Sequence, residues 1–143
     1  MRLVTSDIDP LRILLVEDSA LLRDMLGEML DEIDGVVLNG EADGECAALQ
    51  QMEIGDVDLA IVDLELNQGS GFGVLQRLKQ EPSRFGGVRA VVFSTHAHRA
   101  VRQRCEALGA EAFFDKAEGM DDLLDFVETA VRQGQQRGHS GRD

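Results

Sequence analysis

The sequence predicts a single α/β domain in which a parallel sheet is covered by helices on both faces. Short apolar segments alternate with longer amphipathic segments five times along the chain, a pattern that favours parallel strands joined by helical crossovers. Two apolar segments, residues 13–16 and 90–93, contain no polar side chains, as expected for central strands covered on both sides. The chain has 143 residues, of which 43% are hydrophobic, enough for one core and too few residues for two full domains.

The five expected strands are short apolar segments that each stop at a polar or charged residue. Periodicity alone does not distinguish such segments from buried helices, so their length decides, and segments this short are typical of strands. The strands are expected at residues 12–16, 36–40, 59–62, 90–93 and 112–114.

Five helices are expected, one after each strand. The first has acidic residues facing away from an apolar stripe, which is typical of a helix lying on a sheet. The stripe consists of Leu22, Leu26, Met29, Leu30 and Ile33. The later helices are expected at residues 44–52, 71–80, 97–108 and 120–132. Gly109 is well placed to end the fourth helix.

The composition and the two ends of the sequence define the rest of the organisation. We expect residues 1–11 to form a short N-terminal extension and residues 12–132 to form the domain. Residues 133–143 lack apolar side chains, so we expect them to form a disordered tail, which is too short for an output domain. The first ten residues lack the apolar run of a secretory signal, and no segment resembles a membrane span, so we expect a cytoplasmic protein.

The net charge and the cysteines exclude several classes of function. The formal charge of −13 argues against direct binding to DNA or to an anionic membrane. Cys46 and Cys105 lie far apart and belong to no metal-spaced cluster, so we interpret both as ordinary thiols.

Polar side chains capable of chemistry follow four of the five strands. Glu17 and Asp18 follow the first strand, Asp63 the third and Ser94 the fourth, and Lys116 lies just beyond the fifth. The carboxyl ends of parallel strands meet at one edge of a sheet, which is where such folds bind ligands. Each residue alone has an ordinary explanation as a helix cap, a turn residue or a solvated charge. Together, crowded carboxylates favour a bound cation, and their hard oxygens suit Mg²⁺.

In these residues the chain resembles a response-regulator receiver domain, the CheY-like family. Five short motifs occur in the family's order, and Lys116 lies 22 residues beyond Ser94, as is typical of the family. The resemblance extends from about Leu11 to Arg132 and implies a stand-alone receiver with the flavodoxin-like (βα)5 fold and strand order 2-1-3-4-5. The motifs are Val16-Glu17-Asp18-Ser19, Val62-Asp63-Leu64-Glu65-Leu66, Gly69-Ser70-Gly71, Ser94 and Phe113-Phe114-Asp115-Lys116.

The resemblance implies a role for each residue of the site. Asp63 is expected to accept a phosphoryl group from a histidine kinase or a histidine phosphotransfer protein, which makes the chain a signalling phosphoprotein and not an enzyme. Asp18, Asp63 and the backbone carbonyl of Glu65 are expected to bind Mg²⁺, with Mn²⁺ as an alternative, and Glu17 is expected to act mainly through water. Lys116 and Ser94 are expected to contact the phosphoryl group.

The expected switch links this site to an output face made of the fourth helix, the fifth strand and the fifth helix. Ser94 would draw its loop inward when it contacts the phosphoryl group, and Phe113 would turn toward the space that the loop leaves. Three residues depart from the family pattern. Ala117 stands where proline is frequent, which leaves open whether the Lys116–Ala117 bond is cis. Asn67 also stands where proline is frequent, in the loop after Asp63. Phe113 lacks the hydroxyl of the more frequent tyrosine.

Further expectations concern phosphate lifetime and partners. Glu65 and His96 stand at the positions that flank the path of the hydrolytic water, and are expected to set the dephosphorylation rate, unless both are simply solvated. Basic residues on the fourth helix and acidic residues on the fifth predict a homodimer through the output face, with solvated helix faces as the alternative. The residues are His98, Arg99, Arg102, Arg104, Asp121, Asp122, Asp125 and Glu128. Leu21 and Met25 are expected either to contact a kinase or to belong to the core.

Three other functions fit the sequence less well. A phosphatase of the haloacid-dehalogenase type needs a second aspartate two residues after the first, where this chain has Glu65. A dinucleotide-binding oxidoreductase needs a glycine-rich turn where Glu17 and Asp18 stand. A receiver-like module that works without phosphorylation should lack some acceptor-site residues, yet this chain has all of them.

Overall fold

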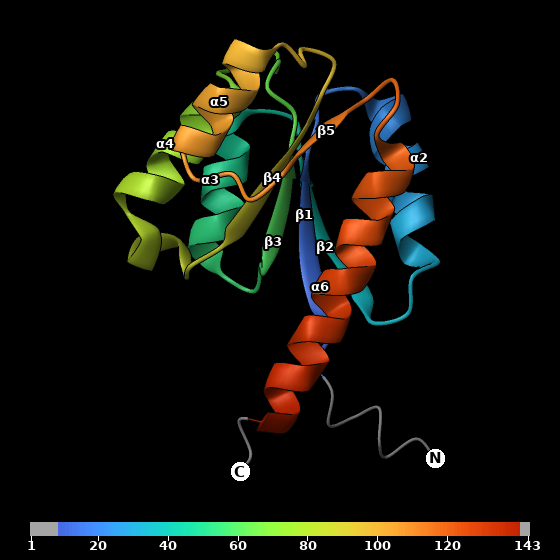
Figure 1. The fold of residues 1–143 in the computed structure, drawn as a ribbon. Helices are drawn as coiled ribbons and strands as arrows, with labels where there is room; N and C mark the ends of the chain where they lie inside the picture. Colours follow the sequence, from blue (N-terminus) through green and yellow to red (C-terminus); the bar gives the residue numbers. More distant parts are fainter. Residues whose placement is uncertain (1–8, 141–143) are drawn as a thin grey trace.

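The computed structural model describes residues 9–140 and contains a five-stranded parallel sheet (Figure 1). The strand order is β2-β1-β3-β4-β5, which confirms the doubly wound fold and the strand order implied by the resemblance. The strands are β1 (Leu11–Val16), β2 (Val36–Ala42), β3 (Leu59–Val62), β4 (Arg89–Ser94) and β5 (Phe113–Asp115).

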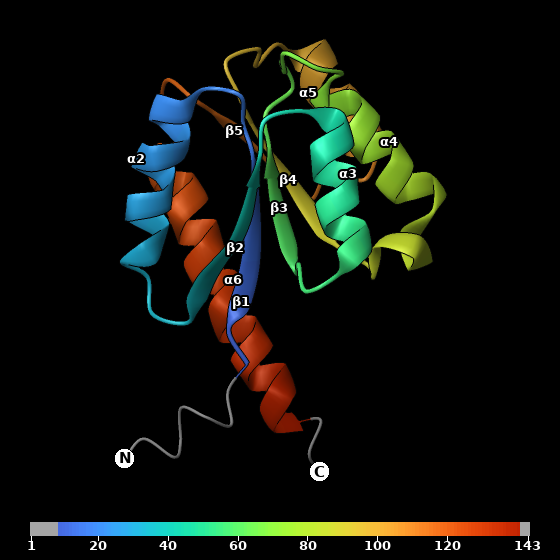
Figure 2. The ribbon, with the colours of Figure 1, turned by 180° about the vertical axis from the view of Figure 1, so that it is seen from behind.

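Helices cover both faces of the sheet, as Figures 1 and 2 show from opposite sides. Helices α2 and α6 lie on one face, and helices α3, α4 and α5 lie on the other. Their bounds are α2 (Ala20–Asp31), α3 (Glu45–Ile54), α4 (Gly71–Gln80), α5 (Arg99–Ala107) and α6 (Met120–Ser140), and a 3-10 helix, η1 (Pro82–Phe85), follows α4.

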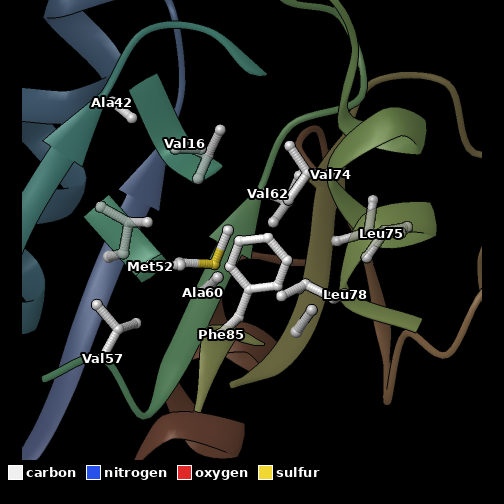
Figure 3. Packing of buried hydrophobic residues seen from close by; sticks show 14 of the residues in the cluster. Val16, Ala42, Met52, Val57, Ala60, Val62, Val74, Leu75, Leu78 and Phe85 are labelled. Carbon is white, nitrogen blue, oxygen red and sulfur yellow. The ribbon is translucent and has the colours of Figure 1, made fainter. Parts of the chain in front are cut away.

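The two faces of the sheet carry separate hydrophobic clusters. Side chains of successive residues in a strand point to opposite faces, so Ile13 and Leu15 pack under α2 and α6 while Leu14 and Val16 pack under α3 and α4. The cluster under α3 and α4 also contains Phe85 of η1, which is 2% exposed and lies between these helices and β3 (Figure 3). Burial on both sides explains why residues 13–16, 59–62 and 90–93 of the central strands are all apolar.

Local sequence sets where several helices begin and end. The hydroxyl of Ser19 accepts a hydrogen bond from the backbone N–H of Leu22 (3.2 Å) at the start of α2. Ser70 does the same for Gly73 at the start of α4 (3.2 Å). Gly109 adopts a left-handed φ of 96° just beyond α5, in agreement with its expected role.

Three features differ from the sequence-based expectation. The β2 strand continues to Ala42, and η1 was not predicted, because its four residues are too few to show helical periodicity. Helix α6 continues to Ser140, beyond Arg132, so the expectation of a tail without regular structure is wrong for residues 133–140. The segment contains glutamine and arginine, which are good helix formers, and although it also contains two glycines it lacks proline, the strongest helix breaker. Residues 1–8 and 141–143, parts of the expected extension and tail, lie outside the described residues. None of the described helices has the length and apolarity needed to cross a membrane.

Candidate functional site

Glu17, Asp18, Asp63, Ser94 and Lys116 lie at the carboxyl edge of the sheet, the edge that is at the top of Figure 1. Glu17 and Asp18 directly follow β1, Asp63 directly follows β3, and Ser94 ends β4. Backbone hydrogen bonds extend the sheet into this edge, since the N–H of Asp63 donates to Val16 (2.9 Å) and the N–H of Lys116 donates to Ser94 (3.0 Å). The backbone therefore fixes where these side chains start.

Lys116 forms the centre of the site through two ion pairs. Its Nζ lies 2.8 Å from Oε1 of Glu17 and 2.9 Å from Oδ2 of Asp63. Both carboxylates are almost completely buried, with residue exposures of 4% and 6%. Buried charges of this kind are stable only when they are paired, so the ammonium group holds the two acids together.

The same acids form a cluster with Asp18. One carboxylate oxygen from each of Glu17, Asp18 and Asp63 lies within 4.8 Å of the others. Three hard oxygen donors at one partly open site suit Mg²⁺, which binds few protein ligands and keeps several waters. The residues that the sequence analysis selected for a metal site thus come together, and their donor chemistry fits the ion.

Burial and pairing shift two pKa values in this site. Burial raises the pKa of the Glu17 carboxyl, although the hydrogen bond from Lys116 acts in the opposite direction. Burial also acts to lower the pKa of the Lys116 ammonium, but its hydrogen bonds to Glu17 and Asp63 outweigh burial and leave that pKa raised. Lys116 is therefore firmly cationic at neutral pH, next to acids that compete for it.

Ser94 and Phe113, the expected switch residues, lie on neighbouring strands. Ser94 is completely buried, and its hydroxyl accepts a hydrogen bond from the backbone N–H of His96 (3.2 Å). Phe113 is partly buried and packs against the cluster under α3, α4 and α5. The bond that follows Lys116 is trans, like every other peptide bond that the structure describes.

Glu65 and His96, from the loops that follow β3 and β4, contact each other. Nε2 of His96 lies 2.8 Å from Oε2 of Glu65, and both side chains are exposed, at 46% and 71%. The backbone N–H of Glu65 also points at Oδ1 of Asp63 (3.4 Å). The two side chains that the sequence analysis selected for control of water are thus in contact with each other.

The sequence analysis missed the residues that hold the loop after Asp63. Oε1 of Glu45 accepts a hydrogen bond from the backbone N–H of Ser70 (2.9 Å), and the side chain of Gln68 accepts one from the backbone N–H of Cys46 (2.9 Å). Gly71 packs so closely on this loop that a side chain there would collide with the backbone carbonyl of Asp63. The only sequence signal was the Gly69-Ser70-Gly71 motif, which marks a tight approach without naming the partner.

The output face and α2 present different surfaces. Arg102 and Arg104 of α5 lie over the rings of Phe113 and Phe72, so both arginines have partners within the chain. On α2, Leu21 is 74% exposed and Met25 is 45% exposed, which places both on the surface and not in the core. Cys105 is buried and Cys46 is exposed, and neither forms a disulfide.

Comparison with known proteins identifies a family. The family model of the response regulator receiver domain matches residues 13–128 of this chain. "Transcriptional regulatory protein PdtaR" of Mycobacterium tuberculosis is 32% identical over 130 residues, and the match covers 89% of this chain and 61% of that protein. "Protein-glutamate methylesterase/protein-glutamine glutaminase" of Treponema denticola is 30% identical over 116 residues, covering 80% of this chain and 30% of that protein. The chain thus spans less than two thirds of either relative.

Solved structures share the fold at lower sequence identity. The response regulator domain of Thermotoga maritima CheB has a TM-score of 0.74 at 20% identity, and the match covers 89% of this chain and 97% of that one. A CheY-like receiver domain protein from Methanospirillum hungatei has a TM-score of 0.75 at 22% identity, covering 90% of this chain and 99% of that one. At these identities the structures support the fold alone.

Proposed function

The chain belongs to the response regulator receiver family, and from this premise we propose that it accepts a phosphoryl group on Asp63 in two-component signal transduction. The observation that carries the proposal is the position of Asp63. Its carboxylate lies at the carboxyl edge of the sheet, 2.9 Å from the Lys116 ammonium and within the acidic cluster. A carboxylate so placed is paired with an ammonium group and belongs to a set of acids that would hold a metal ion.

The proposed chemistry is phosphoryl transfer by positioning and charge neutralisation. An oxygen of Asp63 attacks the phosphorus of a phosphohistidine on a sensor histidine kinase or a histidine phosphotransfer protein, and the phosphorus–nitrogen bond breaks as the phosphorus–oxygen bond forms. Lys116 lies where it can neutralise charge on the transferred group. The chain then carries a signal, and its own chemistry is limited to accepting the group and releasing it slowly.

The acidic cluster supports a magnesium site at the same place. Asp18, Asp63 and the backbone carbonyl of Glu65 would hold the ion, and Glu17 would act mainly through water. When bound, Mg²⁺ or Mn²⁺ offsets negative charge on the phosphoryl oxygens. Because Glu17 is paired with Lys116 at 2.8 Å, it also serves to place the ammonium group beside Asp63.

The proposed response is a movement of the loop that follows β4. Ser94, whose hydroxyl oxygen accepts a hydrogen bond from the N–H of His96, would donate its hydroxyl proton to the phosphoryl group, and Phe113 would turn into the space that the loop leaves. The output face formed by α5, β5 and α6 would then bind a downstream protein. The contacts of Arg102 and Arg104 within the chain leave fewer free cations for the homodimer expected on this face, which stays a prediction.

Surface features support two further parts of the proposal. Leu21 and Met25 are exposed on α2, the helix that begins two residues after Asp18, so α2 would offer apolar contacts to the donor protein. Glu65 and His96 stand two residues beyond Asp63 and Ser94 and contact each other at 2.8 Å, so we expect them to slow the entry of hydrolytic water. If replacing both with alanine leaves the decay of the phosphorylated protein unchanged, they do not control it.

Intact mass after incubation with acetyl phosphate and Mg²⁺ tests the proposal directly. The wild type should gain the mass of one phosphoryl group, and Asp63→Asn should gain none. Asp58→Asn is a matched control, because Asp58 lies at the opposite end of β3 and pairs with Arg12 (3.3 Å). Equal labelling of Asp63→Asn and the wild type would contradict the proposal, and so would a wild type that takes up nothing while remaining folded.

A further inference from the structure

The contacts of one exposed arginine join the two moving parts of the proposed switch. We propose that Arg102 is a positioning residue that holds Phe113 and the loop at residues 95–98 in their resting arrangement, so that neither moves without the other. The inference rests on the proposed function, because that function defines what the loop and the ring do.

Arg102 contacts both parts at once. The central carbon of its guanidinium group lies 4.6 Å from the centroid of the Phe113 ring, a distance typical of a cation–π interaction. Its Nε donates a hydrogen bond to the backbone carbonyl of Ala97 (3.0 Å). Since the guanidinium group is planar and rigid, one orientation serves both contacts, and a shift of the ring or of the loop breaks the geometry for the other.

The loop is also tied at its other end, by groups that belong to the site. The Ser94 hydroxyl accepts a hydrogen bond from the N–H of His96, and the His96 ring contacts Glu65. These contacts of Arg102, Ser94 and His96 together define the arrangement that we call the resting state. Arg102 therefore stabilises the resting state, and its loss should favour the alternative.

The nature of the ring gives Arg102 this role. Phe113 has no hydroxyl group, so no hydrogen bond of its own can fix it in either position. The attraction between a cation and an aromatic ring acts on the ring face, so it is lost when the ring turns away. The guanidinium group thus provides the directional contact that the phenyl group cannot make.

Helix α5 offers a closely matched control. Arg104 lies two residues further on, and its guanidinium carbon is 4.0 Å from the centroid of the Phe72 ring of α4. It carries the same charge on the same helix and packs on a ring of the same type, but its ring belongs to neither the loop nor β5. Arg102→Ala and Arg104→Ala therefore remove equivalent side chains, of which only one is in the proposed coupling.

The first test needs no phosphorylation. Hydrogen–deuterium exchange of the amides at residues 95–98 should be faster by about three- to tenfold in Arg102→Ala, the range expected for loss of one cation–π contact and one hydrogen bond. Arg104→Ala should exchange like the wild type, and Arg102→Lys, which keeps the charge but not the planar fork, should lie in between. Equal exchange in all four proteins would overturn the inference.

The second test measures activation. With acetyl phosphate and Mg²⁺, Arg102→Ala should be labelled about three- to tenfold faster than the wild type, since more of it already has the released loop. Arg104→Ala should be labelled at the wild-type rate. Labelling of Arg102→Ala no faster than the wild type would overturn the inference while leaving the proposed function intact. An unlabelled wild type would instead contradict the function, and loop exchange would still decide the role of Arg102.

Discussion

Replacement of Lys116 by methionine should make the stability of the protein depend on a divalent cation. The change removes the ammonium group that lies 2.8 Å from Glu17 and 2.9 Å from Asp63, and methionine keeps most of the side-chain volume. Both acids then stay nearly buried, at 5% and 7% side-chain exposure, with no cation between them. Like charges in such a place repel strongly unless one is protonated or a metal binds.

The expected loss of stability follows from this burial. Removing one partner of a buried ion pair costs about 3–5 kcal/mol, and because the Lys116 side chain is 16% exposed we expect about 2–4 kcal/mol here. A change of 1 kcal/mol shifts the unfolding midpoint of a domain of this size by about 3–4 °C, so the midpoint should fall by about 6–16 °C. Saturating Mg²⁺ should restore much of this loss, since a ligand at 100 times its dissociation constant stabilises by about 2.7 kcal/mol.

Thermal unfolding in EDTA and in excess Mg²⁺ measures both effects. The shift caused by Mg²⁺ should be larger for Lys116→Met than for the wild type. Lys79→Met is the control, because Lys79 is exposed and donates only to the carbonyl of Ala107. A metal-free Lys116→Met protein as stable as the wild type, with the same response to Mg²⁺, would refute the view that Lys116 compensates buried acids.

Three further changes test other parts of the structure. The raised pKa of Glu17 means that this carboxyl binds more protons in the folded than in the unfolded state, so its contribution to the free energy of unfolding should fall as pH rises above 4.5. Denaturation curves measured in EDTA at several pH values should show a smaller fall for Glu17→Gln than for the wild type. The same dependence of the free energy of unfolding on pH in both proteins would count against this. Gly71→Ala should lower both stability and acetyl-phosphate labelling, because the new methyl group collides with the carbonyl of Asp63, and full labelling of the variant would disprove this displacement. Phe85→Ala should lose about 3–5 kcal/mol in urea denaturation without changing the labelling of the folded protein, whereas a loss below 1 kcal/mol would show that Phe85 is not a core residue.

The positions of the strands could be predicted from the sequence because strand ends coincide with changes in polarity. For β3 the expected and observed bounds agree, since Asp58 and Asp63 flank four apolar residues. The end of α6 was not predictable in the same way. Residues 133–140 contain no apolar side chain, and helix propensity alone gives no signal of where such a helix stops.

In the site, the meeting of residues at strand ends could be predicted from the sequence, whereas contacts that depend on helix packing could not. Asp63 and Lys116 could be predicted to meet because parallel strands deliver their ends to one edge. The contacts of Arg102 with Phe113 and of Glu45 with Ser70 could not, because they join elements whose separation depends on how helices pack. The pairing of Glu65 with His96 was likewise outside the reach of spacing, although both residues had been selected for their positions.

The neighbouring rings of Phe113 and Phe114 point to opposite sides of β5, and this has a consequence for how such a protein can evolve. Phe113 packs with the helices α3, α4 and α5, while Phe114 packs with α2 and α6 and meets the Phe126 ring edge-on at 5.8 Å. A rearrangement of Phe113 therefore changes one layer of the molecule and leaves the contacts of α2 in place. Mutations on α5 can therefore accumulate without disturbing the packing of α2 and α6 on the other face of the sheet.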